Sequence, residues 1–167
     1  MKKLWAPWRL EFILNPQKQK PKTRRGESIF ATLSRQNPSY KNLLLYKGQT
    51  AFVLMNKFPY SNGHLLVLPL RQVNDLAKLN AEEHTELGQL MAVSTRILKK
   101  VLRPEGFNIG LNLGKAAGAG ILDHLHYHIV PRWSGDTNFM PIFAETKVLP
   151  EHLRVTYEKI KKEFDQL

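Results

Sequence analysis

Three histidines, His124, His126 and His128, alternate with the apolar residues Leu125 and Tyr127. Side chains two positions apart on a β-strand point to the same face, so this alternation predicts a strand with three imidazole rings on one side. Successive rings would lie roughly 6.5–7 Å apart along the backbone. That spacing is too wide for hydrogen bonds between the rings, but it allows the three rings to surround one tetrahedral anion.

Three chemistries can use such a row of imidazoles. Alternate histidines on a strand can bind zinc, but the chain has no cysteine. His64 or a distant carboxylate would then have to complete the ligand shell, because Asp123 would point to the opposite face. A neutral imidazole nitrogen can instead attack phosphorus and form a phosphoramidate intermediate. The third possibility is packing in the core, which is costly for three imidazoles together.

The loop that precedes the histidines consists mainly of small residues. It contains glycines at 114, 118 and 120 and alanines at 116, 117 and 119. Such a loop lets a ligand approach the backbone closely and can direct N–H groups at phosphate oxygens. Next to three imidazoles, it favours the phosphate chemistry over the other two.

The elements that must position these residues can be predicted from patterns of apolar residues and from capping signals. We expect a short helix over 28–35, a β-hairpin over 43–46 and 50–55, a strand over 64–69, a long helix from Asn80 to Arg103, a strand over 107–112 and a helix from about Pro150. Strands on either side of one long helix indicate an α+β fold with an antiparallel sheet rather than parallel βαβ units.

The charge of the chain is concentrated at its beginning. Residues 1–25 hold eight of the 25 lysines and arginines and one of the 14 acidic residues. We therefore divide the chain into an N-terminal apolar segment with a basic arm, 1–25, and a single domain, 26–167. A basic arm suits nucleic acid, anionic lipid, a polyphosphate substrate or solubility alone. The absence of cysteine, of a signal peptide and of any membrane-length apolar run predicts a cytoplasmic protein.

The histidine segment resembles a known family signature. His124-Leu125-His126-Tyr127-His128-Ile129-Val130 is similar to the motif of the histidine triad (HIT) superfamily of nucleotidyl hydrolases and transferases. The segment from Asn56 through Pro59 to Gly63-His64 and Pro69 resembles the upstream part of the family pattern. The resemblance covers roughly residues 28–136 and implies a HIT-like fold with one long central helix and a C-terminal helix.

The resemblance also implies a role for each site residue. His126 would be the nucleophile that attacks the α-phosphorus, the carbonyl of His124 would accept its other ring N–H, and His128 would bind the non-bridging oxygens. His64 and His124 would complete the hydrogen-bond network. The expected nucleotide-binding residues are Asn56 at the ribose, Phe30 and Phe52 near the base, and Asn112, Gly118, Ala119, Gly120 and Trp133.

Within the family, Trp5-Ala6-Pro7-Trp8-Arg9 together with residues 123–133 is most similar to bacterial diadenosine tetraphosphate phosphorylase-like members. We therefore expect cleavage of dinucleoside polyphosphates, by inorganic phosphate or by water, through a nucleotidyl-histidine. Ala119 and Gly120 stand where relatives carry Ser, Thr or Gln, so backbone N–H groups, Lys115 or Asn112 would assist the leaving group.

Several alternatives remain open at this point. The chain could be a nucleoside phosphoramidase or adenylate hydrolase of the same family, a nucleotide- or nucleic-acid-binding module with little catalysis, or a metal-dependent hydrolase. The leading hypothesis needs neither a metal nor a cofactor. It implies a homodimer, with a nucleotide as substrate, and it does not involve a membrane.

Overall fold

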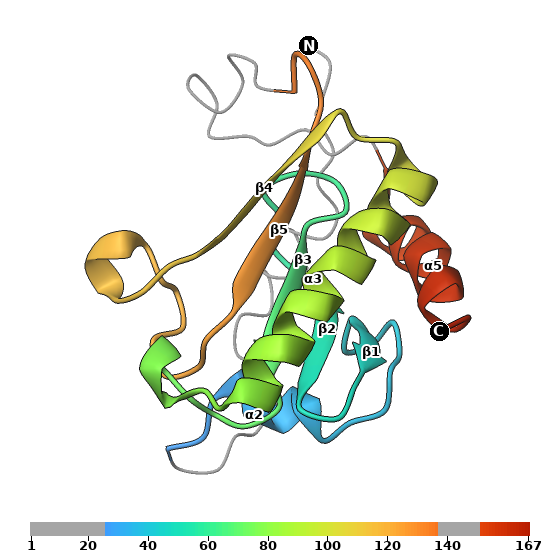
Figure 1. The fold of residues 1–167 in the computed structure, drawn as a ribbon. Helices are drawn as coiled ribbons and strands as arrows, with labels where there is room; N and C mark the ends of the chain where they lie inside the picture. The colour runs from blue at the N-terminus through green and yellow to red at the C-terminus, as the bar shows by residue number, and fades with distance from the viewer. Residues whose placement is uncertain (1–25, 137–150) are drawn as a thin grey trace, which may run out of the picture.

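The part of the chain that the structure describes forms a five-stranded antiparallel sheet with helices packed on it (Figure 1). A computed structural model describes residues 26–136 and 151–167. Its elements are α2 Ile29–Ser34, β1 Leu44–Lys47, β2 Ala51–Met55, β3 Leu65–Pro69, η1 Leu76–Lys78, α3 Ala81–Leu102, β4 Gly106–Leu111, η2 Lys115–Ala117, β5 Tyr127–Arg132 and α5 Leu153–Phe164. The strand order is β1-β2-β3-β5-β4. The predicted α+β fold with a long central helix and a C-terminal helix is confirmed, and the predicted N-terminal segment and basic arm, 1–25, lie outside the described residues.

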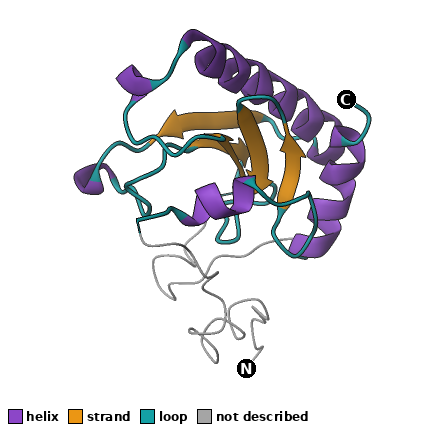
Figure 2. Ribbon diagram, turned by 90° about the horizontal axis from the view of Figure 1, so that it is seen from below, coloured by secondary structure: helices purple, strands orange, loops and turns teal. Residues whose placement is uncertain are grey.

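The two faces of the sheet differ in what covers them. Figure 2 shows α3 on one side of the strands and α2 on the other. Ala51, Val53 and Met55 of β2 belong to the core under α3 and α5, whereas Phe52 and Leu54 belong to a smaller cluster with Phe30 of α2. Because successive side chains of a strand alternate between faces, β2 and β3 are apolar on both sides and fully buried. Among the described helices, none combines the length and apolar character needed to cross a membrane.

β5 begins at Tyr127, so the prediction that the strand includes His124 and His126 is wrong. The last pair of the β3–β5 ladder is Val67 with Tyr127. The N–H of Leu70 donates toward β2, to the carbonyl of Thr50 (2.7 Å), so the nitrogen of Pro69 faces β5, where proline has no hydrogen to donate. The ladder ends there, and the two histidines before Tyr127 are released from it.

β4 forms an edge of the sheet. Its register continues from Gly106 opposite Arg132 to Leu111 opposite Tyr127, and its other side has no partner strand among the described residues. Ile109 in the middle of this strand is 49% exposed. An exposed edge can pair with a strand of another chain, so a surface is available for the predicted homodimer, which stays a prediction.

The N-terminus of α3 is fixed by the predicted capping box. The Asn80 side chain accepts the Glu83 N–H (2.8 Å), and the Glu83 carboxylate accepts the Asn80 N–H (2.9 Å). This exchange satisfies N–H groups that a helix start otherwise leaves without partners. Glu83 is only 4% exposed, so it also acts as a buried charge at this end of the helix.

A second carboxylate of α3, that of Glu86, holds the β1–β2 turn. It accepts hydrogen bonds from the backbone N–H groups of Gln49 (2.9 Å), Thr50 (2.5 Å) and Ala51 (3.0 Å), and from the Thr50 hydroxyl (2.6 Å). Burial raises the pKa of Glu86, but these hydrogen bonds outweigh it and lower the pKa below its usual value. A Cβ at Gly48 would come within 2.1 Å of the carboxylate, so the close approach requires glycine at that position.

We expect Glu86→Ala to destabilise the fold by about 2 kcal/mol, because a set of hydrogen bonds to a charged group is lost and three backbone donors are left without it. The matched control is Gln89→Ala on the exposed face of the same helix, expected to change stability by no more than about 0.5 kcal/mol. Urea unfolding at pH 7 measures both. Equal stabilities of the two variants would show that the turn does not depend on this carboxylate.

Candidate functional site

Four histidines gather on the face of the sheet that α2 covers. His128 lies opposite Leu66 in the β3–β5 register, and Leu66 belongs to the cluster under α2. The ring of His128 has its centroid 5.0 Å from that of His126 and 5.1 Å from that of His64, the residue just before β3. The predicted placement of the imidazoles on one side is therefore present, although only His128 belongs to a strand.

The hydrogen bonds of His64 and His128 determine where their protons lie. The backbone N–H of Tyr60 donates to Nδ1 of His64 (3.1 Å), so the proton of the neutral His64 ring is on Nε2. That Nε2 is 2.9 Å from Nδ1 of His128 and donates to it. His128 must then carry its own proton on Nε2, which is buried and has no hydrogen-bond partner within residues 26–136 and 151–167.

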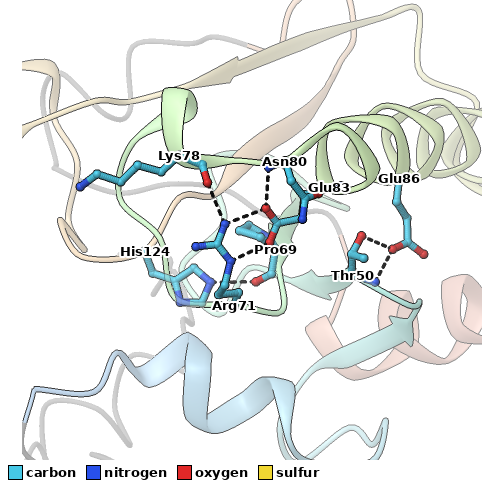
Figure 3. Close-up of polar contacts among 8 residues, drawn as sticks. All are labelled: Thr50, Pro69, Arg71, Lys78, Asn80, Glu83, Glu86 and His124. Atoms are coloured by element: carbon cyan, nitrogen blue, oxygen red, sulfur yellow. Dashed lines mark hydrogen bonds and ion pairs between the residues drawn. The ribbon is translucent and has the colours of Figure 1, made fainter.

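The same reasoning fixes the other two rings. Nδ1 of His126 lies 2.9 Å from the carbonyl oxygen of His124, to which only a protonated nitrogen can donate. The lone pair of His126 is therefore on Nε2. Nε2 of His124 donates to the carbonyl of Pro69 (2.8 Å), as Figure 3 shows. The hydrogen bond from the His126 ring to the carbonyl of His124, implied by the family resemblance, is present.

Burial lowers the pKa of two of these rings, those of His124 and His128. Desolvation, followed by the nearby charge of His126, lowers the pKa of His128 to about 4. Desolvation also lowers the pKa of His124, against the opposing effect of its hydrogen bond to Pro69. His124 and His64 are 1% and 0% exposed. At neutral pH His124 and His128 are therefore imidazoles rather than imidazolium ions.

The segment after Pro69, whose carbonyl accepts the hydrogen bond of His124, is tied to the start of α3. Arg71, two residues after Pro69, donates from its guanidinium to both oxygens of Glu83 (3.0 and 2.8 Å) and to the carbonyl of Lys78 (2.8 Å) (Figure 3). The hydrogen bond to Arg71 is the main cause of the lowered pKa of Glu83. The pairing of Arg71 with Glu83 could not be predicted from the sequence, because nothing in the spacing of the two residues indicates it.

The predicted base-binding phenylalanines form the wall behind the histidines. Phe30 contacts the rings of His124 (5.8 Å between centroids) and His126 (5.3 Å). Phe52 lies 6.5 Å from His124 and is 0% exposed. Phe52 therefore packs against His124, whereas Phe30 contacts His126 as well.

Asn56, the residue expected at the ribose, lies beside His64. Its Nδ2 is 3.3 Å from Nδ1 of His64, and its Oδ1 accepts the N–H of Phe58 (2.9 Å). The predicted ribose-binding residue thus also helps to orient His64. Its place two residues after Leu54 keeps it on the face of the sheet that carries the site.

The small-residue loop is less available to phosphate than expected. The N–H of Gly118 donates to Lys115 (3.0 Å) and that of Ala119 to Gly114 (3.3 Å), so two of the predicted phosphate-binding groups are used inside the loop. Gly118 has a φ of +87° and a Cβ there would be 3.9 Å from Nδ2 of Asn112. The structure brings these two residues together. Gly120 follows in an exposed part of the loop.

Trp133 is the predicted residue that the structure places elsewhere. It lines a cavity of about 460 Å³ together with Asn62, Val101, Leu102 and Glu151. Trp133 directly follows β5, which ends at Arg132, and two of its neighbours in this cavity, Val101 and Leu102, belong to α3. Trp133 thus lies beside α3 in this chain, and its role in nucleotide binding stays a prediction.

The comparisons with known proteins agree with this geometry. Residues 37–135 match the HIT domain. The chain is 37% identical over 165 residues to the AP-4-A phosphorylase of Mycobacterium tuberculosis, covering 98% of this chain and 85% of that protein. It is 30% identical over 125 residues to the bis(5′-adenosyl)-triphosphatase of Dictyostelium discoideum, covering 74% of this chain and 82% of that protein.

Among solved structures, a histidine triad nucleotide-binding protein of Sulfolobus tokodaii superposes with a TM-score of 0.65 at 25% identity, covering 84% of this chain and 93% of that one. The sheet order, the central helix and the residues matched by the domain therefore lead to one conclusion. This chain belongs to the HIT domain family.

Proposed function

We propose that this protein cleaves dinucleoside polyphosphates by transferring a nucleotidyl group to His126 and then to inorganic phosphate or water. The observation that carries the proposal is where the protons of two neighbouring rings, His126 and His128, lie. His126 has its lone pair at Nε2, whereas the N–H of His128 is buried and has no hydrogen-bond partner among the described residues, and the two ring centroids are 5.0 Å apart. A nucleophile and a hydrogen-bond donor for the attacked group thus lie side by side.

In the first step, Nε2 of His126 attacks the α-phosphorus. An N–P bond forms, and the bond from phosphorus to the bridging oxygen breaks, so that the leaving nucleotide departs with that electron pair. The proton stays on Nδ1, which donates it in a hydrogen bond to the carbonyl of His124, and this bond stabilises the positive charge that develops on the ring. The tautomer fixed by this hydrogen bond is the reactive one.

During this step charge accumulates on the oxygens of the attacked phosphorus. The N–H on Nε2 of His128 is the buried donor available for them, and it needs no reorientation because His64 already fixes the ring. A donor that is held in place and shielded from water stabilises developing charge more strongly than a solvated one. In the second step, an oxygen of phosphate or water attacks the phosphorus and releases His126.

The substrate class is supported by the relatives. A phosphorylase and a triphosphatase, both named for diadenosine compounds, match most of this chain. They differ in the acceptor, since a phosphorylase uses phosphate and a hydrolase uses water. The greater identity and coverage of the phosphorylase favour phosphate as the acceptor here.

We expect diadenosine tetraphosphate to yield ATP and ADP when inorganic phosphate is present, and ATP and AMP when phosphate is absent. His126→Ala should lower both rates by at least about 10³-fold, because the covalent route is lost. His84→Ala, at an exposed histidine of α3, is the matched control and should retain full activity. Anion-exchange chromatography of the nucleotides provides the measurement. Full activity of the His126 variant would contradict the proposal, and AMP as the product at saturating phosphate would assign hydrolysis.

The stability of the fold should fall as the pH is lowered from about 6.5 toward 4. His128 has a folded-state pKa of about 4, whereas its unfolded value is about 6.5. Over this range the unfolded chain binds a proton that the folded chain does not, so unfolding is favoured. The lowered pKa of His124 acts in the same direction. His128→Gln should lose less stability between pH 7 and pH 5 than the wild type.

Urea midpoints at the two pH values measure this difference. His84→Gln, which removes an exposed imidazole, should behave as the wild type does. An equal loss of stability in His128→Gln and the wild type would contradict the buried, neutral state assigned to His128.

A further inference from the structure

The loop over residues 56–64, between β2 and β3, supplies the groups that fix the proton of His64. The backbone N–H of Tyr60 donates to Nδ1 of the His64 ring (3.1 Å), and Nδ2 of Asn56, from the same loop, lies 3.3 Å from that nitrogen. The N–H of His64 donates to the carbonyl of Ser61 (3.2 Å) and closes a turn. Because a hydrogen bond weakens steeply when its angle falls, the loop must keep this shape for its donors to meet the ring.

The same loop is held by two helices that pack on the other face of the sheet, away from the histidines. Gly63 has a φ of +71°, and a Cβ there would come within 2.3 Å of the Leu102 side chain of α3. Its neighbour Asn62 has its Oδ1 3.0 Å from the hydroxyl of Thr156 in α5. Asn62 and Thr156 are 9% and 0% exposed. The loop is thus in direct contact with both helices through two adjacent residues.

The hydroxyl of Thr156, rather than its methyl group, makes the link to the loop. Its oxygen is also 2.7 Å from a carboxylate oxygen of Glu151, which in turn pairs with Lys159. If the hydroxyl were removed, the amide of Asn62 would lose this buried partner, and an unsatisfied buried polar group is costly. The rest of α5 is anchored in the core by Tyr157, Ile160 and Phe164, so we expect this loss to release the loop rather than the helix.

We propose that Asn62 and Thr156 form a positioning pair for the nucleotidyl transfer. The pair holds the loop in the shape in which the N–H of Tyr60 keeps the proton of His64 on Nε2. That proton is donated to His128, whose own N–H is the donor assigned to the attacked phosphate. The inference rests on the proposed function and adds two residues to it. Both act through His64 and need no contact with the substrate.

Two substitutions at Thr156 separate the hydrogen bond from packing, since valine keeps the methyl group and serine keeps the hydroxyl. Thr156→Val should lower kcat for diadenosine tetraphosphate by about tenfold and change KM by less than about twofold, because a donor to developing charge acts mainly in the transition state. Thr156→Ser should retain kcat within about twofold of the wild type. The matched control is Thr85→Val in α3, whose exposed hydroxyl donates only within its own helix, to the carbonyl of Ala81 (2.8 Å).

Asn62→Ala removes the same hydrogen bond from the side of the loop and tests the inference if Thr156→Val does not fold. It should lower kcat by a similar factor. The double variant should be no slower than the slower single variant, because both substitutions remove one interaction. Equal losses of kcat in the valine and serine variants, or a wild-type kcat in both Thr156→Val and Asn62→Ala, would overturn the inference.

A second measurement needs no substrate. Two-bond proton–nitrogen NMR spectra distinguish a protonated ring nitrogen from an unprotonated one, and His64→Gln identifies the signals of His64. The wild type should show the proton of His64 on Nε2, whereas Thr156→Val should show both tautomers. An unchanged His64 spectrum in Thr156→Val would overturn the positioning role. If the wild type did not cleave the substrate, the proposed function would fail, and the NMR comparison would still decide whether the pair positions His64.

Discussion

The site depends on one hydrogen bond, from Nδ1 of His126 to the carbonyl oxygen of its neighbour but one, His124. It places the lone pair of His126 on Nε2, the atom that attacks phosphorus in the proposed reaction. The other proton positions follow independently from Tyr60, through His64, to the N–H of His128. Two short hydrogen-bond networks thus place the proposed nucleophile and the proposed donor next to each other.

The end of the β3–β5 ladder makes this arrangement possible. If the ladder continued past Tyr127, the backbone before it would be committed to pairing with β3. Pro69 has no N–H to offer on that side, and its carbonyl accepts the ring of His124 instead. The pair of Arg71 and Glu83 then anchors the following segment to the capped start of α3 (Figure 3). The long helix therefore contributes to the position of a histidine that it does not carry.

Local patterns made much of the fold predictable. The strand that carries His128, the capping box at Asn80 and the turn after Lys47 each depend on neighbouring residues only, and each is present in the structure. The predicted start of β5 was wrong because the actual start depends on which side of β3 the nitrogen of Pro69 faces. That side is known only once the register between the strands is known. The internal hydrogen bonds of Gly118 and Ala119 and the contacts of Tyr60 likewise arise only after the chain has folded.

The central claim is that His126 becomes covalently bound to the nucleotide during turnover. The most direct measurement is a rapid alkaline quench of the enzyme with diadenosine tetraphosphate radiolabelled at its α-phosphates, followed by mass spectrometric mapping of the labelled peptide. The account predicts adenylate on His126, an adduct that is acid-labile, and its disappearance when phosphate is added. Turnover without any covalent adduct, or an adduct on another residue, would contradict it.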